Sequence, residues 1–159
     1  MQPFYDNRSF VDRPFGCPLD ITLDVPVPPS VNVTRRIDHA GQRAVKNWKK
    51  NADNHLIQSS QYRRARTALG GKAANKFMIV VTLDETQTGI DLDNAIKVTL
   101  DYLKSRELIV DDGQNHCRGI DLRWGEAPAG CRITLKPIEN WQTLGEVSRE
   151  VVRKIEAAE

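Results

Sequence analysis

The stretch Gly89–Gln114, GIDLDNAIKVTLDYLKSRELIVDDGQ, contains five aspartates within a pattern typical of strand, helix and strand. A good N-cap residue, Asp93, precedes apolar residues at helical spacing, which predicts a helix that ends near Ser105. The apolar stripe of this helix consists of Ile96, Leu100 and Leu103. Residues 108–110, LIV, then predict a short strand, so the stretch favours a sheet with a helix packed against it.

The acids of this stretch lie at the ends of the predicted elements or on one polar helix face. Asp91 follows the turn at Gly89, and a spacing of four residues places Asp93, Lys97 and Asp101 on one face of the helix. Asp111 and Asp112 end the short strand, where side chains alternate in direction, so we expect at most one of them to join Asp91 and Asp93 directly. A cap, a helical ion pair and a turn would each explain one of these residues structurally.

Three converging carboxylates would repel one another unless a cation lay among them. Hard divalent cations, above all Mg²⁺, prefer such oxygen ligands and also bind phosphate. The chain carries no glycine-rich phosphate loop, no G-x-S-x-G elbow and no H-E-x-x-H zinc motif beside these acids. The pattern therefore indicates a carboxylate-bound magnesium site assisted by one lysine.

The segments before this stretch predict two strands and a helix. Residues 21–25 alternate apolar and polar side chains, as a half-buried strand does, and the prolines that follow predict an exposed loop presenting Asn32, Arg35 and Arg36. From about Gln42, apolar residues at helical spacing predict a helix whose other face is basic. Residues 77–83, FMIVVTL, predict a central strand covered on both faces.

The segments after the stretch predict a hairpin and a terminal helix. Residues 117–124 and 131–138 both alternate and are separated by GEAPAG, which is typical of a β-hairpin. The last segment places apolar residues on one stripe of a helix, for docking on the sheet or on another subunit: Trp141, Leu144, Val147, Val151 and Ile155. Together the segments predict an α/β (α+β) domain with a mixed sheet packed by helices.

Length and composition support one ordinary domain. The 159 residues are 40% hydrophobic and 28% charged, and the longest apolar runs are too short to span a membrane. We expect a loose N-terminal arm at residues 1–18, without the features of a secretory signal, and a folded domain at residues 19–159. Three cysteines without a C-x-x-C pair argue against disulfides and zinc, which favours a cytoplasmic location.

The charges are distributed unevenly along the chain. Residues 35–76 contain eleven lysines and arginines against two acids, whereas residues 84–126 contain ten acids against five bases. Such a division favours a polyanion bound by the basic part, although a solvated basic helix would look the same. The candidates for contacting nucleic acid are Asn32, Arg35, Arg36, Arg43, Lys46, Lys49 and Lys50.

The acidic stretch resembles the RusA-like Holliday-junction resolvases, whose signature is D-x-D-N-x-x-K, a further aspartate on the same helix, and then D-D. Here DLDNAIK begins at Asp91, Asp101 follows on the helix, and VDD ends at Asp112. The segment PPSVN, residues 28–32, is similar to a proline segment of that family, so the resemblance spans about Ile21 to Leu135. Two positions depart from the pattern: no glycine lies shortly before the D-D pair, and Asn115 replaces an apolar residue.

The resemblance implies a dimeric, RusA-like fold and a crossover junction endodeoxyribonuclease. It implies that Asp91, Asp93 and Asp112 hold Mg²⁺, for which Mn²⁺ can substitute, and that Lys97 is catalytic. The expected partners are four-way DNA and a second copy of the chain, with no membrane. A non-catalytic DNA-binding protein would keep the basic helix without the metal, and a phosphohydrolase acting on nucleotides would keep the acids without the basic surface.

Overall fold

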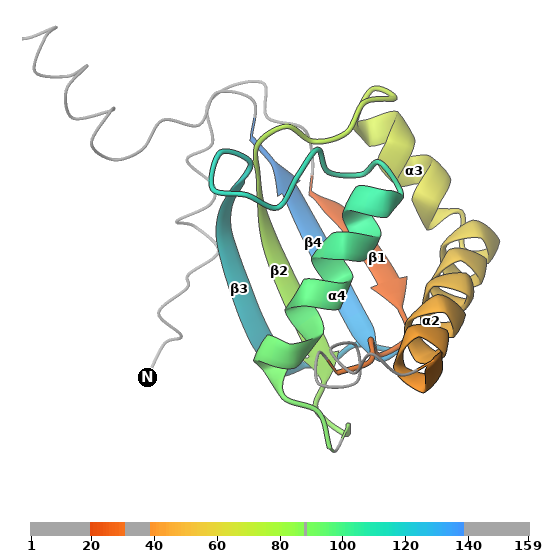
Figure 1. Cartoon of the computed structure of the whole chain (residues 1–159). Coiled ribbons are helices and arrows are strands. Elements are labelled where there is room, and N and C mark those ends of the chain that lie inside the picture. The colour runs from red at the N-terminus through yellow and green to blue at the C-terminus, as the bar shows by residue number, and fades with distance from the viewer. Residues whose placement is uncertain (1–19, 31–38, 88, 139–159) are drawn as a thin grey trace, which may run out of the picture. The chain divides into compact units, whose positions relative to one another are not determined.

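A four-stranded mixed sheet in the order β1-β4-β2-β3 carries three helices on one of its faces (Figure 1). The computed structural model describes residues 20–30, 39–87 and 89–138, and the elements are β1 (Ile21–Val25), α2 (His39–Gln58), α3 (Gln61–Ala68), β2 (Phe77–Asp84), α4 (Leu92–Ser105), β3 (Cys117–Gly125) and β4 (Cys131–Pro137). The predicted α+β domain with a mixed sheet is confirmed for these residues. The predicted arm at residues 1–18 and the terminal helix lie outside them.

The strand β2 forms the centre of the core, as its apolar sequence predicts. It pairs in parallel with β3 and antiparallel with β4, and α4 connects it to β3. Its side chains alternate between buried residues and partly buried ones, so within the described residues the core lies on one face of this strand. The predicted cover on both faces is therefore not found there. The buried residues of β2 are Phe77, Ile79, Val81 and Leu83.

The predicted hairpin of β3 and β4 is wrong, because β2 lies between these two strands. The connection after β3 crosses the end of β2, where Asp84 donates its backbone N–H to the Gly130 carbonyl over 3.0 Å. Gly130 has a φ of 114°, and a side chain there would come within 2.7 Å of Val27. In this arrangement the most apolar strand has hydrogen-bonded partners at both edges.

The long basic helix is found where the sequence predicts it. Trp48, Ala52 and Leu56 of α2 are buried, and the Trp48 indole donates a 2.9 Å hydrogen bond to the Pro26 carbonyl. The chain then turns at Ser60, which has a φ of 60°, into the short helix α3, which the sequence did not predict as a separate element. As a result α2 and α3 both pack beside β1, and α4 lies over the centre of the sheet (Figure 1).

Candidate metal and nucleic-acid site around helix α4

The helix α4 begins two residues earlier than the sequence predicted. Asp91, with extended backbone angles, occupies the N-cap position, and Asp93 lies in the first turn. The predicted cap at Asp93 is therefore wrong. The Asp91 side chain does not bond to the helix N–H groups but accepts a hydrogen bond of 3.3 Å from the Asn94 side chain. Both carboxylates still lie where the partial positive charge of a helix start favours negative charge.

Two lysines on α4 contact one acid of the helix itself and two acids of the loop that follows it. Lys97 Nζ lies 3.4 Å from Asp101 Oδ1 and 3.5 Å from Asp112 Oδ2. Lys104 Nζ lies 3.2 Å from Asp111 Oδ1 and 3.1 Å from Asp112 Oδ1. We call these five residues the α4 charge cluster. Asp112 is its centre, because both lysines reach this one carboxylate.

The predicted strand at residues 108–110 is only a single bridge. Ile109 pairs with Ala74, and the Ala74 N–H donates a 2.9 Å hydrogen bond to the Leu108 carbonyl. Because the chain does not continue as a strand, the predicted divergence of Asp111 and Asp112 is wrong, and both side chains reach Lys104. The turn that follows is closed by a 2.9 Å bond from the His116 N–H to the Gly113 carbonyl.

The two central charges of the cluster stabilise each other's ionised form. The hydrogen bond from Lys104 holds the pKa of Asp112 below its ordinary value, against a small opposing effect of burial. The hydrogen bonds to Asp112 and Asp111 raise the pKa of Lys104. Lys97 and Lys104 are 59% and 41% exposed, so water and salt screen these contacts and the lysines can exchange partners.

The three predicted metal ligands do not form one group in the described residues. Asp91 and Asp93 flank the start of α4, whereas Asp112 follows its other end, and a helix of this length spans about 21 Å. Lys97, one turn after Asp93, links Asp112 to the same helix face. Within residues 20–30, 39–87 and 89–138, no three His, Cys, Asp or Glu side chains are arranged to hold a metal ion. The oxygen donors fit Mg²⁺ in type, and their role as its ligands stays a prediction.

The basic surface of α2 lies beside the chain that leaves α4. Arg43, Lys46 and Lys50 are exposed and Lys49 is partly exposed, as predicted. A pocket of about 430 Å³ is lined by the three lysines of this helix together with Gln42, Val45, Asp53 and Arg106. The other predicted DNA contacts, Asn32, Arg35 and Arg36, lie outside the described residues. The basic helix thus contributes a concave surface as well as a charged face.

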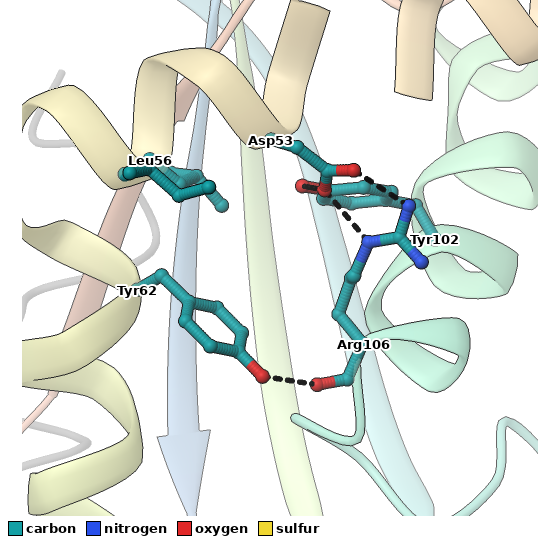
Figure 2. A pocket seen from close by; sticks show the side chains of 6 residues that line it. Asp53, Leu56, Tyr62, Tyr102 and Arg106 are labelled. Atoms are coloured by element: carbon teal, nitrogen blue, oxygen red, sulfur yellow. Dashed lines mark hydrogen bonds and ion pairs between the residues drawn. The ribbon is translucent and has the colours of Figure 1, made fainter. Parts of the chain in front are cut away.

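A network that the sequence did not predict joins α2 to the end of α4. Arg106 donates to Asp53 twice, from Nε and from Nη2, each over 2.7 Å, and Tyr102 donates its hydroxyl to Asp53 Oδ1 over 2.8 Å (Figure 2). The Arg106 guanidinium lies 5.3 Å from the centre of the Tyr102 ring, which Trp48 contacts edge-on. The only signal in the sequence was that Asp53 is an isolated acid among many bases.

The electrostatics of this network follow from its partial burial. Burial alone would raise the pKa of Asp53, but the hydrogen bonds from Arg106 and Tyr102 outweigh that effect and lower the pKa. Burial and the neighbouring carboxylate raise the pKa of Tyr102, so its hydroxyl stays protonated and continues to donate. Asp53 is therefore an ionised carboxylate that accepts two hydrogen bonds from the Arg106 guanidinium and one from the Tyr102 hydroxyl.

Comparison with known proteins adds no assignment to this geometry. No protein-family model matches the chain, and no curated protein matches it. In the described part of the chain, no helix has the length and apolar character needed to cross a bilayer.

Proposed function

We propose that the chain is a magnesium-dependent endodeoxyribonuclease that cuts four-way DNA junctions by phosphodiester hydrolysis. One observation carries the proposal: Asp112 and Lys97, which match the second D-D acid and the lysine of the resolvase signature, are in contact at 3.5 Å on the helix face that includes Asp93. Asp91 and Asp93 lie at the start of the same helix, and the proposal requires Asp112 to approach them when the metal binds.

In this proposal Asp91, Asp93 and Asp112 would hold the metal. When bound, Mg²⁺, or Mn²⁺ in its place, supplies a lowered pKa for water and stabilises charge on the phosphate. Lys97 holds the scissile phosphate or orients the attacking water, because its ammonium already lies beside Asp112. Asp112 can be released from Lys104 readily, because water and salt screen this exposed lysine.

The basic residues would hold the DNA without reading its sequence. Lysine and arginine side chains bind backbone phosphates and release counterions, so affinity falls as salt rises. On α2 the exposed cations form a continuous charged face that suits this role. The predicted set consists of Asn32, Arg35, Arg36, Arg43, Lys46, Lys49 and Lys50.

We propose that the working unit is a cytoplasmic homodimer. A four-way junction has approximate two-fold symmetry, and its resolution requires paired cuts in strands of like polarity. One chain offers one copy of the signature, whereas a two-fold dimer offers two sites related by the symmetry of the substrate. Sedimentation at micromolar concentration should therefore give twice the chain mass of 18.0 kDa.

A labelled four-way junction tests the activity directly. Wild-type protein should cut it in symmetric pairs with Mg²⁺ and not with EDTA. Asp112→Asn should cut at least about 100-fold more slowly, since a metal supplies several kcal/mol to the transition state. The neighbouring Asp111→Asn, which also removes a contact with Lys104, is the matched control and should cut nearly normally.

Three outcomes would change the assignment. Full cleavage by Asp112→Asn would show that Asp112 is not a ligand. Binding of the junction without any Mg²⁺-dependent cutting would favour a non-catalytic DNA-binding protein. Hydrolysis of nucleotides without cleavage of the junction would favour a phosphohydrolase.

A further inference from the structure

Two pockets lie on opposite sides of the Asp53–Arg106 ion pair, and both include this pair in their lining. The first is the basic pocket of about 430 Å³ on α2, which we call the lysine pocket. The second has a volume of about 260 Å³ and is lined by Leu56, Ile57, Tyr62 and Tyr102; we call it the tyrosine pocket (Figure 2). Neither contains a member of the α4 charge cluster. Because the ion pair lines both pockets, we treat them as the two halves of one hollow, cationic on one side and apolar on the other.

Among the residues that line the lysine pocket, the cations outnumber the acids. Its acid, Asp53, forms an ion pair with Arg106 and also interacts electrostatically with Lys49. Lys46, Lys49 and Lys50 form no ion pair with another described residue. Arg106 also keeps one guanidinium nitrogen, Nη1, without a hydrogen bond to any described residue, and Figure 2 shows it directed away from Asp53. An anion such as a phosphate group fits this side of the hollow.

The accessible apolar and aromatic surface of the tyrosine pocket comes from Ile57 and Tyr62. Ile57, at its edge, is 67% exposed. Tyr62 is held in place by a 3.2 Å hydrogen bond from its hydroxyl to the Arg106 carbonyl, so its ring cannot turn freely. Tyr102 lies fully buried beneath these two residues, with Arg106 over its ring, so it supports the pocket and offers no ring face to a ligand. A flat aromatic group would cover this surface at a small cost in side-chain entropy.

The network also holds the three helices together, and that structural role accounts for Asp53, Tyr102 and the stem of Arg106. It does not use the exposed side chain of Ile57 on one side of the ion pair, or the lysines on the other side, which form no ion pair with another described residue. A ligand that supplies an apolar ring and an anion together would cover the Ile57 side chain and pair with the lysines.

We propose that this hollow binds one unpaired nucleotide, with its phosphate in the lysine pocket and its base in the tyrosine pocket. Small-ligand sites usually have volumes of about 300 to 1,000 Å³. The tyrosine pocket, at about 260 Å³, lies just below this range and the lysine pocket, at about 430 Å³, near its lower end, so a single nucleotide fits better than a base pair. The chemistry is shared by a free nucleotide and by an unpaired nucleotide in a strand. The choice of branched DNA as its source rests on the proposed function.

NMR titration of the isotope-labelled protein in EDTA tests the binding. dAMP should shift amide signals on both sides of the Asp53–Arg106 pair. Inorganic phosphate should shift only those of the lysine pocket, and deoxyadenosine only those near Ile57 and Tyr62. The absence of shifts in the hollow with dAMP would overturn the proposal, even if the protein cuts DNA. Binding of dAMP by a protein without nuclease activity would leave this inference standing and reject the proposed function.

Matched substitutions separate the two halves of the hollow. Ile57→Ser should weaken dAMP binding about fivefold by removing exposed apolar surface, whereas Ile120→Ser, at a 48% exposed isoleucine on β3, should not. Replacing Lys49 and Lys50 together with glutamine should flatten the salt dependence of binding, and Lys72→Gln, outside the hollow, should leave it unchanged. Equal effects of the test and control substitutions would contradict the site.

Labelled DNA distinguishes the two sources. A four-way junction with one unpaired 2-aminopurine should lose fluorescence on binding as the base stacks on Tyr62, and a fully paired duplex with the same label should not. Loss of the signal with Ile57→Ser is expected as well. Binding of dAMP without any change in the labelled junction would assign the hollow to a free nucleotide and overturn DNA as the source.

Discussion

Two groups of paired charges lie on and just after α4, and they differ in geometry and in the exposure of their cations. The α4 charge cluster joins Lys97 and Lys104, which are 59% and 41% exposed, to three acids through contacts of 3.1 to 3.5 Å. The network of Asp53, Arg106 and Tyr102 uses shorter bonds of 2.7 and 2.8 Å, with Asp53 and Arg106 only 30% and 33% exposed. Lys104 of the exposed cluster and Arg106 of the network are only two residues apart in the sequence.

The difference shows how position changes the role of the same chemical groups. Lysine is a flexible point charge, and the exposed pairs it forms contribute little and exchange readily, which suits acids that are proposed to bind a ligand. Arginine presents a rigid fork, so its two-pronged bond to a partly buried carboxylate fixes the distance between α2 and α4. The cluster is therefore suited to exchanging its ion-pair partners, and the network is suited to holding α2 and α4 at a fixed distance.

The largest stability effect should come from Asp53→Asn. The substitution removes the charge that two Arg106 nitrogens and the Tyr102 hydroxyl bind, and it leaves a partly buried cation without its partner. We expect unfolding in urea to show a loss of about 2 kcal/mol, within the range for breaking a hydrogen-bonded charge pair. Tyr102→Phe, which removes one neutral donor, should cost about 1 kcal/mol. A loss below that of Tyr102→Phe would contradict the network's structural role.

The pH dependence of stability should sharpen this result. The pKa of Asp53 is lower in the folded protein than its ordinary value of 3.8, so its contribution is full above about pH 4 and is lost as the pH falls through the folded pKa. The difference in unfolding free energy between wild type and Asp53→Asn should therefore stay constant at neutral pH and shrink below pH 3.8. Other acids titrate equally in both proteins and cancel. A difference that grows in acid would reverse the sign argued here.

The smallest effect should come from Lys104→Gln in the exposed cluster. This lysine contacts two acids, but it is 41% exposed, so its loss should change the free energy of unfolding less than either Asp53→Asn or Tyr102→Phe does. Raising the salt concentration should remove even that difference, because exposed pairs are screened, while the cost of Asp53→Asn should persist. A cost for Lys104→Gln equal to that for Asp53→Asn would remove the distinction between the two groups.

Several elements could be predicted because their signals are local. The spacing of Trp48, Ala52 and Leu56 predicted α2 and its buried face, and the spacing of Ile96, Leu100 and Leu103 predicted α4 to its last residue, Ser105. The apolar run at residues 77–83 predicted the central strand. These patterns report which side of an element is turned away from water, and that preference is set by neighbouring residues in the chain.

The local boundaries at the candidate site were less predictable. Asp91 and Asp93 are both good cap residues, and the backbone at Asp91 decides between them. Residues 108–110 are apolar enough for a strand, yet only Ile109 finds a partner, so the chain turns and brings Asp111 and Asp112 to the same lysine. In each case the outcome depends on which neighbouring backbone is close enough to pair.

The sequence alone determined the helix faces, the central strand, and the acids and bases that give the two charged surfaces. Only the tertiary structure decided that β2 separates β3 from β4 and that Asp53 meets Arg106, 53 residues further along the chain. The physical reason is that the spacing of apolar residues indicates only which face of a single helix or strand is buried. Strand order and long-range ion pairs depend instead on how the elements satisfy one another's edges and charges when they pack.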